Sequence, residues 1–464
     1  MSNPRATALA AAVICFVATH TTAAPVEIRE GRVLFNLSAG LTLEGVAQGR
    51  RDFSPDRFTI WGPVAGTPHG SFVLAVNRDA MAGVVQTPEA GLFRLRLTAW
   101  GLQVVERIDG GLECRVGDVR PPVVDAAPPA APASGPCDDG SVIDLLVVYT
   151  QEARDDAGGV AAIEAVIDLM VEYNNIAYAN SLAETQMNLV YAGQLGPGKD
   201  PSLGQLANPA DGVVDGVHAL RDAYGADQVA LIYAGGGGVA LGLWNLDPES
   251  EANAFCANGL DSAPFVLAHE LGHNMGCCHA LGDGGGCPPE GGLLFPYSNG
   301  HRFVGDSGEL WHTVMAYSPG IRIENFSNPD ISFDGQPTGI PEGEPEAADN
   351  VMTINLSAFT VSNWRCNDGI CAALDLPSDA EDCTGNGVPD LCDIALGTSD
   401  DANGNGVPDE CECLGDLDGN GVVGLVDFLM LLAAWGTPGA DLDGDGDTGI
   451  TDLLALLARW GPCR

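Results

Sequence analysis

Basic residues are scarce in this chain of 464 residues, which carries 20 Lys and Arg against 63 Asp and Glu, a formal net charge of −43. Lysine occurs once, at Lys199. A surface this acidic repels phosphate backbones and anionic lipid, which argues against nucleic-acid binding. The attractive partners that remain are cations.

Long apolar runs are also missing. No stretch reaches the roughly 18–20 apolar residues of a spanning helix, so no membrane span is predicted. The run at residues 8–18 follows Arg5 and precedes small residues, which is typical of an export signal over 1–24; the alternative is a buried N-terminal helix. The 14 cysteines fit disulfides in an oxidising compartment. The chain is therefore predicted to be secreted and extracellular, either free or held at a cell surface.

The acidic charge is unevenly spread. Residues 25–136 carry 11 basic and 12 acidic side chains, residues 137–366 carry 6 and 31, and residues 367–464 carry 2 and 20. The first segment is nearly neutral, as expected of a removable piece that docks on an acidic body.

Two organisational units precede the main domain. Residues 25–120 alternate apolar and polar side chains between turn glycines, which predicts a β-rich pro-segment. Residues 121–136 form a Pro/Ala linker, expected to be extended and open to proteases.

Residues 137–366 alternate strand-like and helix-like patterns, which predicts an α/β layer on a mostly parallel sheet. The Gly-rich stretch 234–243 is either an edge strand along which a substrate lies extended or a plain loop. Strands are expected at 143–149, 187–191 and 229–233, and helices at 160–180, 213–224 and 347–364.

Three histidines with the spacing of a catalytic zinc site stand out. His269 and His273 lie four apart and share one helix face, and Glu270 lies beside them, placed to accept a proton from water. Gly276 permits a left-handed turn that ends the helix. His279 then supplies a third imidazole and leaves a fourth position open, as catalytic zinc requires.

These histidines, Gly276 and the following Thr-Val-Met-Ala-Tyr at 313–317 resemble the metzincin metalloproteases. The likeness spans about 137–366, and it is nearest to the reprolysin-like bacterial branch that contains peptidyl-Asp metalloendopeptidases. It implies a metzincin α/β fold with an active-site helix, the three histidines as ligands and Glu270 as general base. It also implies Met315 as the apolar floor beneath the zinc.

Three further residues lie close to this motif in the sequence, one tyrosine and two cysteines. Tyr317 matches a tyrosine that astacin- and serralysin-like members use as a switchable ligand; a packed core tyrosine is the alternative. Cys277 and Cys278 occupy variable positions of the motif, and both are expected in disulfides, with Cys256 and Cys287 as partners, although the sequence does not determine the pairing.

Cysteine parity suggests a latency device. Cys114 is the one cysteine between the signal and the linker, and the twelve later ones could pair among themselves. A lone pro-segment thiol can fill the open zinc position as thiolate. The alternatives are a free buried cysteine and a bridge to Cys137.

The C-terminal residues 414–464 contain two calcium-type loops that resemble a type I dockerin. In each, oxygen donors alternate around a position-6 glycine, as a hard cation requires, and an apolar helix follows, at 425–435 or 450–460. A dockerin implies a cohesin-like or cell-surface partner, and the alternative is a solvated acidic linker. The predicted ligands are Asp416, Asp418, Asn420, Val422 and Asp427, and Asp441, Asp443, Asp445, Asp447 and Asp452.

Residues 367–413 contain two related loops that resemble thrombospondin type 3 repeats, braced by Cys383, Cys392, Cys411 and Cys413. The candidate calcium ligands are Asp382, Asn386, Asp390 and Asp393 in the first loop, and Asp401, Asn403, Asn405, Asp409 and Glu412 in the second.

The sequence thus predicts a secreted Zn²⁺-dependent endopeptidase of proteins or peptides, made as a zymogen, with small Ca²⁺-dependent helical modules that dock or anchor it. The competing hypothesis is a calcium-dependent extracellular scaffold or adhesion protein whose metalloprotease-like domain is catalytically idle. An intact Glu270 argues against that hypothesis, because an idle fold has no need of a base.

Overall fold

The computed structural model describes residues 26–29, 31–97, 103–108, 138–288 and 292–366, which are called here the β-segment (26–108) and the body (138–366). In the tail (370–462) it describes 370–374, 376, 380–386, 388–399, 401, 406–408, 411, 415–418, 420, 422–442 and 446–462. The signal, the linker, Cys114, Asn403, Asn405, Asp409, Glu412, Asp443 and Asp445 lie outside the described residues.

The body is built on a five-stranded sheet in the order β11-β10-β12-β14-β13. The first four strands are parallel and β13 pairs antiparallel with β14, so the mostly parallel sheet is confirmed. Within the Gly-rich stretch 234–243, only the three residues of β13 form a strand, and this strand lies at the edge of the sheet. The strands are β10 (Val142–Tyr149), β11 (Gln186–Gln194), β12 (Gln228–Tyr233), β13 (Gly238–Ala240) and β14 (Phe255–Gly259).

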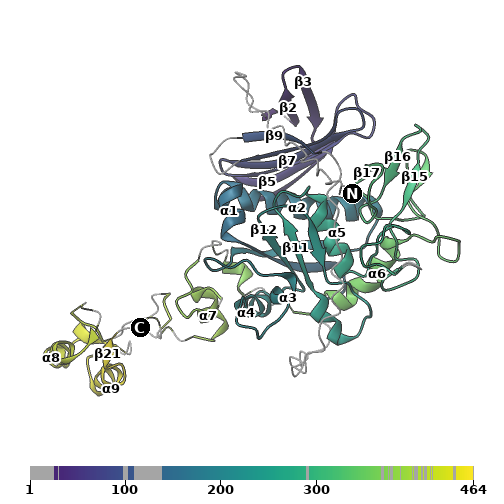
Figure 1. The fold of residues 1–464 in the computed structure, drawn as a ribbon. Coiled ribbons are helices and arrows are strands. Elements are labelled where there is room, and N and C mark those ends of the chain that lie inside the picture. Colours follow the sequence, from purple (N-terminus) through teal and green to yellow (C-terminus); the bar gives the residue numbers. More distant parts are fainter. Residues whose placement is uncertain are drawn as a thin grey trace, which may run out of the picture.

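One long helix, α2 (Val160–Ser181), is buried along most of its length. It lies between the body sheet and the β-segment, which explains why its sequence is apolar on more than one face (Figure 1). The other helices of the body are α1 (Gln151–Ala157), α3 (Leu203–Leu206), α4 (Gly216–Ala223), η1 (Pro248–Asn253), α5 (Phe265–Asn274) and α6 (Asn350–Val361).

Short strands follow α5, and residues at and after β17 (Ile321–Arg322) add contacts to the β-segment beside those of α2. β15 (Arg302–Val304), β16 (Leu310–His312) and β17 make one small sheet, and β18 (Ser332–Phe333) pairs with β19 (Gln336–Pro337). Trp311 is buried here together with Phe303 and Ile323.

The β-segment consists of a six-stranded antiparallel sheet and a three-stranded sheet packed on one of its faces. β6 shows the alternation that builds this layer: Phe72 and Leu74 join the core between the two sheets, whereas Val73 and Ala75 join the core around α2. The strands are β1 (Val26–Arg29), β2 (Arg32–Ser38), β3 (Leu41–Val46), β4 (Gly49–Ser54), β5 (Arg57–Pro63), β6 (Ser71–Asn77), β7 (Ala80–Thr87), β8 (Gly91–Leu97) and β9 (Gln103–Ile108).

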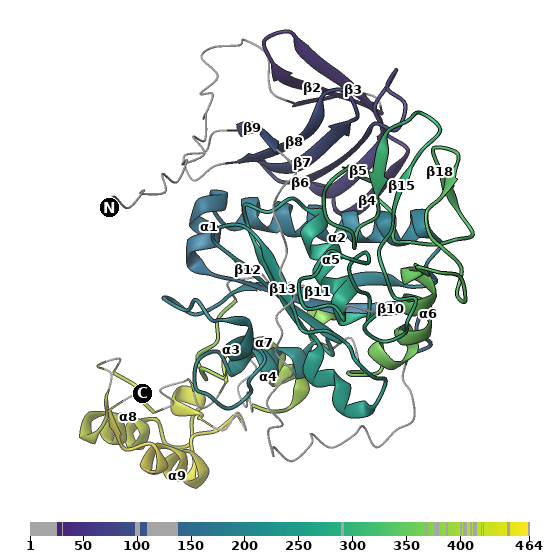
Figure 2. The ribbon, with the colours of Figure 1, turned by 45° about the vertical axis from the view of Figure 1, so that its right-hand side comes forward.

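The last helices of the tail stand apart from the body in both views (Figures 1 and 2). α8 and α9 enclose a small core of five buried residues, Val423, Leu431, Ala440, Leu442 and Leu456. The tail elements are η2 (Ala372–Leu374), α7 (Asp390–Leu396), β20 (Val422–Val423), α8 (Leu425–Ala434), η3 (Pro438–Ala440), α9 (Ile450–Ala458) and β21 (Gly461–Pro462). In the described part of the chain, no helix combines the length and apolar character needed to cross a bilayer.

Candidate metal centre

The three predicted ligands converge on one point. His269 and His273 project from α5, and His279 follows after the helix has ended. Their Nε2 atoms form a nearly equilateral triangle with edges of 3.2, 3.1 and 3.1 Å. Three neutral acceptor nitrogens cannot all be bonded to one another, so this geometry points to a shared cation.

A backbone carbonyl holds the other nitrogen of each ring. Nδ1 lies 2.9 Å from Val314 O for His269, 2.9 Å from Cys277 O for His273 and 2.7 Å from Gly284 O for His279. A carbonyl can only accept, so each Nδ1 carries the proton and each Nε2 presents its lone pair. The tautomers are thereby fixed for metal binding.

The donor set fits zinc. Tetrahedral zinc with Zn–N distances of about 2.0–2.1 Å separates its nitrogens by about 3.3 Å, close to the triangle observed. Burial lowers the pKa of His269 and His273 well below the usual value, and it lowers the pKa of His279 to about 4. All three rings are thus neutral near pH 7, as ligation requires.

Glu270 is fully buried next to the histidines, and burial raises the pKa of its carboxyl well above the ordinary range. A cation beside it acts in the opposite direction and favours the carboxylate. The protonation state of this carboxyl therefore depends on whether a cation is held by the histidines.

Met315 lies against the middle of α5. A Cβ built on Gly272 would be 2.5 Å from Met315 Sδ, so the glycine between the two helical histidines makes room for the methionine. Gly276 adopts φ +89° directly after α5, and a Cβ there would lie 2.7 Å from the Cβ of Leu294. Only glycine fits this turn, which brings His279 back toward the helix.

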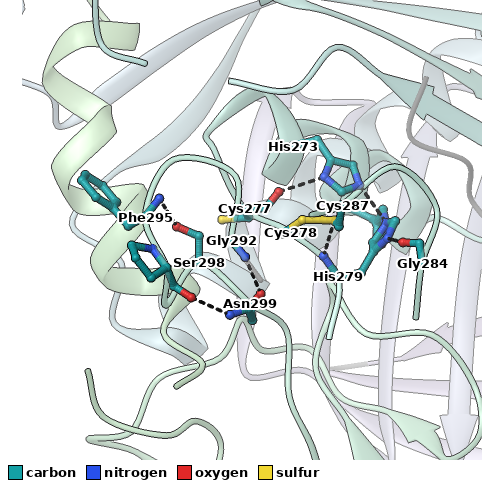
Figure 3. Close-up of a disulfide and its surroundings, with 12 residues drawn as sticks. His273, Cys277, Cys278, His279, Gly284, Cys287, Gly292, Phe295, Ser298 and Asn299 are labelled. Carbon is teal, nitrogen blue, oxygen red and sulfur yellow. Dashed lines mark hydrogen bonds between the residues drawn. A yellow bond between two sulfur atoms is a disulfide. The ribbon is translucent and has the colours of Figure 1, made fainter. Parts of the chain in front are cut away.

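A disulfide closes the loop that carries His279. Cys278 is bonded to Cys287, and the Cys287 Sγ also accepts the His279 backbone N–H at 3.0 Å. Figure 3 shows this bond beside His279, with Cys277 pointing the other way. The bridge fixes the third ligand without bringing a thiol to the histidines.

The expectation that Cys277 is disulfide-bonded is wrong. Cys277 and Cys256 are both free and buried, and the Cys277 Sγ lies 3.7 Å from Asn350 O of α6. Adjacent residues at the end of a helix turn point in different directions, so Cys277 enters the core while Cys278 faces the loop. The sequence could not separate these two roles.

Tyr317 lies beside the histidines. Its ring centroid is 4.3 Å from that of His279 and 5.8 Å from that of His269. Its backbone is fixed as well, since its N–H donates to Asp283 at 2.9 Å and its carbonyl accepts from Arg302 Nε at 3.0 Å. The tyrosine therefore belongs to the site, and its ligation of the metal stays a prediction.

Sequence reasoning missed two residues of this region. Arg322 donates to Val314 O, the same carbonyl that holds His269, and its guanidinium lies 4.2 Å from the centroid of the Phe265 ring. His312, which no sequence pattern marks, lines a cavity of about 460 Å³ beside Tyr317 together with Arg322. No motif marks either position; only the fold brings them to the metal centre.

In the tail, the structure describes most of the predicted ligands of the last two calcium loops, which lead into α8 and α9. Carboxylate oxygens of Asp416, Asp418 and Asp427 lie within 4.8 Å of one another. Asp427 is buried and accepts the backbone N–H groups of Leu417 and Gly424, while Asp452 accepts those of Leu442 and Gly449. Asn420, Val422, Asp441 and Asp447 lie in the same loops.

The upstream loops are described in part. Asn386 Nδ2 donates to Asp393 at 2.9 Å, and Asp390 accepts the N–H of Cys383. Asp390 and Asp393 belong to α7, a helix that the sequence analysis did not predict. Asp382 and Asp401 accept the N–H groups of Gly385 and Gly406. Among the described residues of this region, Cys371 is bonded to Cys392 and Cys383 to Cys411.

Residues 139–327 match the Reprolysin_5 family, described as Metallo-peptidase family M12. The chain carries a metallopeptidase domain. A peptidyl-Asp metalloendopeptidase of Xanthomonas campestris pv. campestris is 28% identical over 341 residues, which cover 65% of this chain and 76% of that protein. One from Stenotrophomonas maltophilia is 29% identical over 238 residues, 48% of this chain and 53% of the relative. These likenesses support a metalloendopeptidase.

The solved structure of metalloproteinase-II from Bacteroides fragilis is also similar, at 11% identity and a TM-score of 0.32, over 52% of this chain and 78% of that one. The support for the enzyme class therefore comes from the family match, the sequence relatives and the geometry of the histidines.

Proposed function

We propose that the chain is a secreted zinc-dependent endopeptidase, made as a zymogen and carrying a calcium-dependent tail that docks or anchors it. The observation that carries the enzymatic part is the triangle of three neutral imidazoles beside a buried carboxyl, Glu270. A purely structural zinc site is closed by four protein ligands, whereas three leave a position for water or substrate.

A bound zinc ion would lower the pKa of its water toward ~7 and polarise the scissile carbonyl. Glu270 takes the proton from the attacking water and returns it to the leaving amine. The carbonyls of Val314, Cys277 and Gly284 keep the three rings in place throughout. β13 lies at an edge of the body sheet, so an extended substrate can add to it by main-chain hydrogen bonds.

Hydrolysis of an unfolded protein by linker-cut material tests this function. We expect a zinc chelator to stop the reaction, and Glu270→Ala to lower the rate by about 10²–10⁴-fold while one zinc per chain is retained. Zinc binding without any hydrolysis, in the wild type as in the variant, would leave the idle calcium-dependent scaffold as the better hypothesis.

The relatives' name suggests a preference for Asp at the cut site, and one cavity supports it. The hollow beside Tyr317 is lined by two cationic side chains, Arg322 of the body, where such side chains are few, and Arg107 of the β-segment. We expect a peptide with Asp next to the scissile bond to be cut faster than its Asn counterpart. Arg322→Met should remove most of that difference, although Arg322 also supports Val314.

For latency, Cys114 remains the proposed ligand that fills the open zinc position before activation. We expect a Cys114→Ala chain to hydrolyse peptides without linker cleavage, and a Cys256→Ala chain to stay latent. Equal latency of both variants would instead favour a free buried Cys114 or a bridge to Cys137.

For the tail, the proposed calcium ions are supported by the close carboxylates of Asp416, Asp418 and Asp427. Sites of this kind bind at ~0.1–1 mM, so extracellular calcium would fill them. Many apolar side chains of α8 and α9 are exposed, including Leu429 and Leu454, and so are Trp435 and Trp460, which follow the two helices. A docking surface for a cohesin-like or cell-surface partner requires such exposure. Calcium-dependent retention on such a partner, lost with Asp427→Asn, is the test.

A further inference from the structure

The contact between the β-segment and the body has an apolar core of its own. Buried side chains of β6 and β7 form one continuous cluster with α2 and the body sheet. Several of them are small, Ala75, Ala80 and Ala82, which lets the helix approach the strands closely. This contact resembles the interior of a domain more than a temporary cover.

Around this core, side chains of the β-segment donate hydrogen bonds to acidic side chains of α2. Glu164, Asp168 and Glu172 recur every four residues on α2, where like charges destabilise an isolated helix. Each has a donor on the β-segment: Asn77 Nδ2 lies 2.9 Å from Glu164, Arg57 makes two bonds of 2.8 Å to Asp168, and Arg51 Nε lies 3.1 Å from Glu172. The Asp168 side chain is 0% exposed, so its charge depends on Arg57.

Further donors of the β-segment contact the two chain segments that flank the metal centre in the sequence, one before α5 and one after Met315. Before α5, Arg96 pairs with Asp261 at 2.8 Å. After Met315, Gln86 Nε2 donates to the Arg322 carbonyl at 2.9 Å and Ser71 donates to Glu324 at 2.8 Å. The β-segment therefore braces the chain that leads into the active-site helix and the chain that follows the methionine.

The cavity beside Tyr317 is formed jointly. One wall comes from the β-segment, with Thr87, Leu92 and Arg107, and the other from the body, with Phe265 and Ile321. A body without the β-segment would lose the first wall, and the cavity would open into a shallow surface.

We propose that the β-segment stays docked on the body after the linker is cut and forms one wall of the substrate pocket. This rests on the proposed zymogen, and it separates two roles of the N-terminal region. Cutting the linker leaves the stretch with Cys114 attached at one end only, while the sheet itself remains. The working enzyme is then a non-covalent complex of two chains, held by basic donors facing acidic acceptors.

Size-exclusion chromatography of the full chain, cut at a specific protease site inserted in the linker, tests the docking. We expect the two pieces to co-elute at about 0.15 M salt. Arg51→Met combined with Arg57→Met should weaken the association at least about 100-fold. The double variant leaves the buried Asp168 carboxylate without its cation, and Glu172 keeps the Thr59 hydroxyl in place of one. Arg50→Met is the matched control, since Arg50 pairs with Asp52 inside the β-segment, and it should stay within about threefold of wild type.

Separation of the wild-type pieces as soon as the linker is cut would overturn the proposal. So would a double variant that binds as tightly as wild type, provided that circular dichroism shows both pieces folded. These outcomes do not depend on proteolytic activity, so a failure of the proposed enzyme function leaves the docking result intact.

Peptide hydrolysis by the docked complex tests the shared wall, with Arg107→Met as the variant and Arg50→Met as the control. We expect Arg107→Met to raise the KM for a peptide with Asp next to the scissile bond at least about tenfold, with less change in kcat, because the metal centre keeps its ligands while the wall loses its cation. Equal KM values of the two variants would show that the β-segment is only a cover.

Discussion

The body and the tail reach their predicted metal sites by opposite routes. In the body, the carbonyls of Val314, Cys277 and Gly284 orient the histidines, and the rings sit deep in a large core. In the tail, acidic side chains surround loops above a core of five buried residues, and apolar side chains of α8 and α9 remain exposed. The body arranges its histidines before any ion arrives, whereas the proposed calcium sites of the tail would need an ion to offset repulsion among their own carboxylates.

Removing one imidazole has the largest expected effect on the body. We expect His273→Ala to lose zinc at micromolar free metal and to lower peptide hydrolysis by more than about 100-fold. This exceeds the loss of about 10–100-fold that is typical when a residue that only hydrogen-bonds a metal ligand is removed. His301→Ala is the control, because that ring stacks on Phe303 and is not one of the three converging imidazoles. Equal zinc content of the two variants, measured by atomic emission, would contradict the assigned ligands.

Calcium depletion should separate the two regions. In a Glu270→Ala chain stripped of ions and reloaded with zinc alone, we expect an added protease to cut the tail rapidly and to leave the body intact. Adding about 1 mM calcium should protect the tail. Asp427→Asn should raise the calcium midpoint, whereas Asp200→Asn, on the exposed surface of the body, should not.

A tail that resists the protease without calcium would mean that its small core suffices. The distinction between a site arranged in advance and one completed by its ion would then fail for the tail.

The turn after α5 can be broken without touching a ligand. Gly276→Ala should cost about 1–2 kcal/mol for the left-handed backbone and about 1–3 kcal/mol more for the contact with Leu294. Gly282→Ala is matched, with φ +88° and nothing within 4 Å of its Cβ, and should cost only the first amount. Denaturant unfolding of both variants measures the difference, and equal losses would refute the close approach at Gly276.

The adjacent cysteines should differ in their effect. Cys278→Ala opens the loop that holds His279, which should cost about 2–3 kcal/mol and weaken zinc binding. Cys277→Ala removes a free buried thiol and should cost about 1 kcal/mol or less, with zinc affinity unchanged. Competition with a zinc-binding dye measures the affinities, and a larger loss in Cys277→Ala would contradict the observed pairing.

The sequence was sufficient for the features that depend on local pattern. The spacing of His269, His273 and His279 and the glycine at Gly276 predicted the metal centre. Apolar runs predicted β10 and β12, and the long helical pattern predicted α2. Each of these depends on a short stretch of chain whose periodicity or turn chemistry is self-contained.

Features that depend on distant segments could not be read from the sequence. The pairing of Cys278 and the free state of Cys277 follow from how a helix end meets α6. Arg322 reaches the metal centre only through the fold, and β14 is too short and too polar to show a strand pattern. The docking of the β-segment was foreseen as a charge difference, but its shared core with α2 was not.

X-ray absorption at the zinc edge of the Cys114→Ala chain, reloaded with zinc, most directly tests the arrangement of ligands in the body. We predict one zinc per chain with three imidazole nitrogens at about 2.0–2.1 Å and no sulfur. A sulfur scatterer at about 2.3 Å, or a shell with fewer than three imidazoles, would contradict the assignment of His269, His273 and His279 as the zinc ligands.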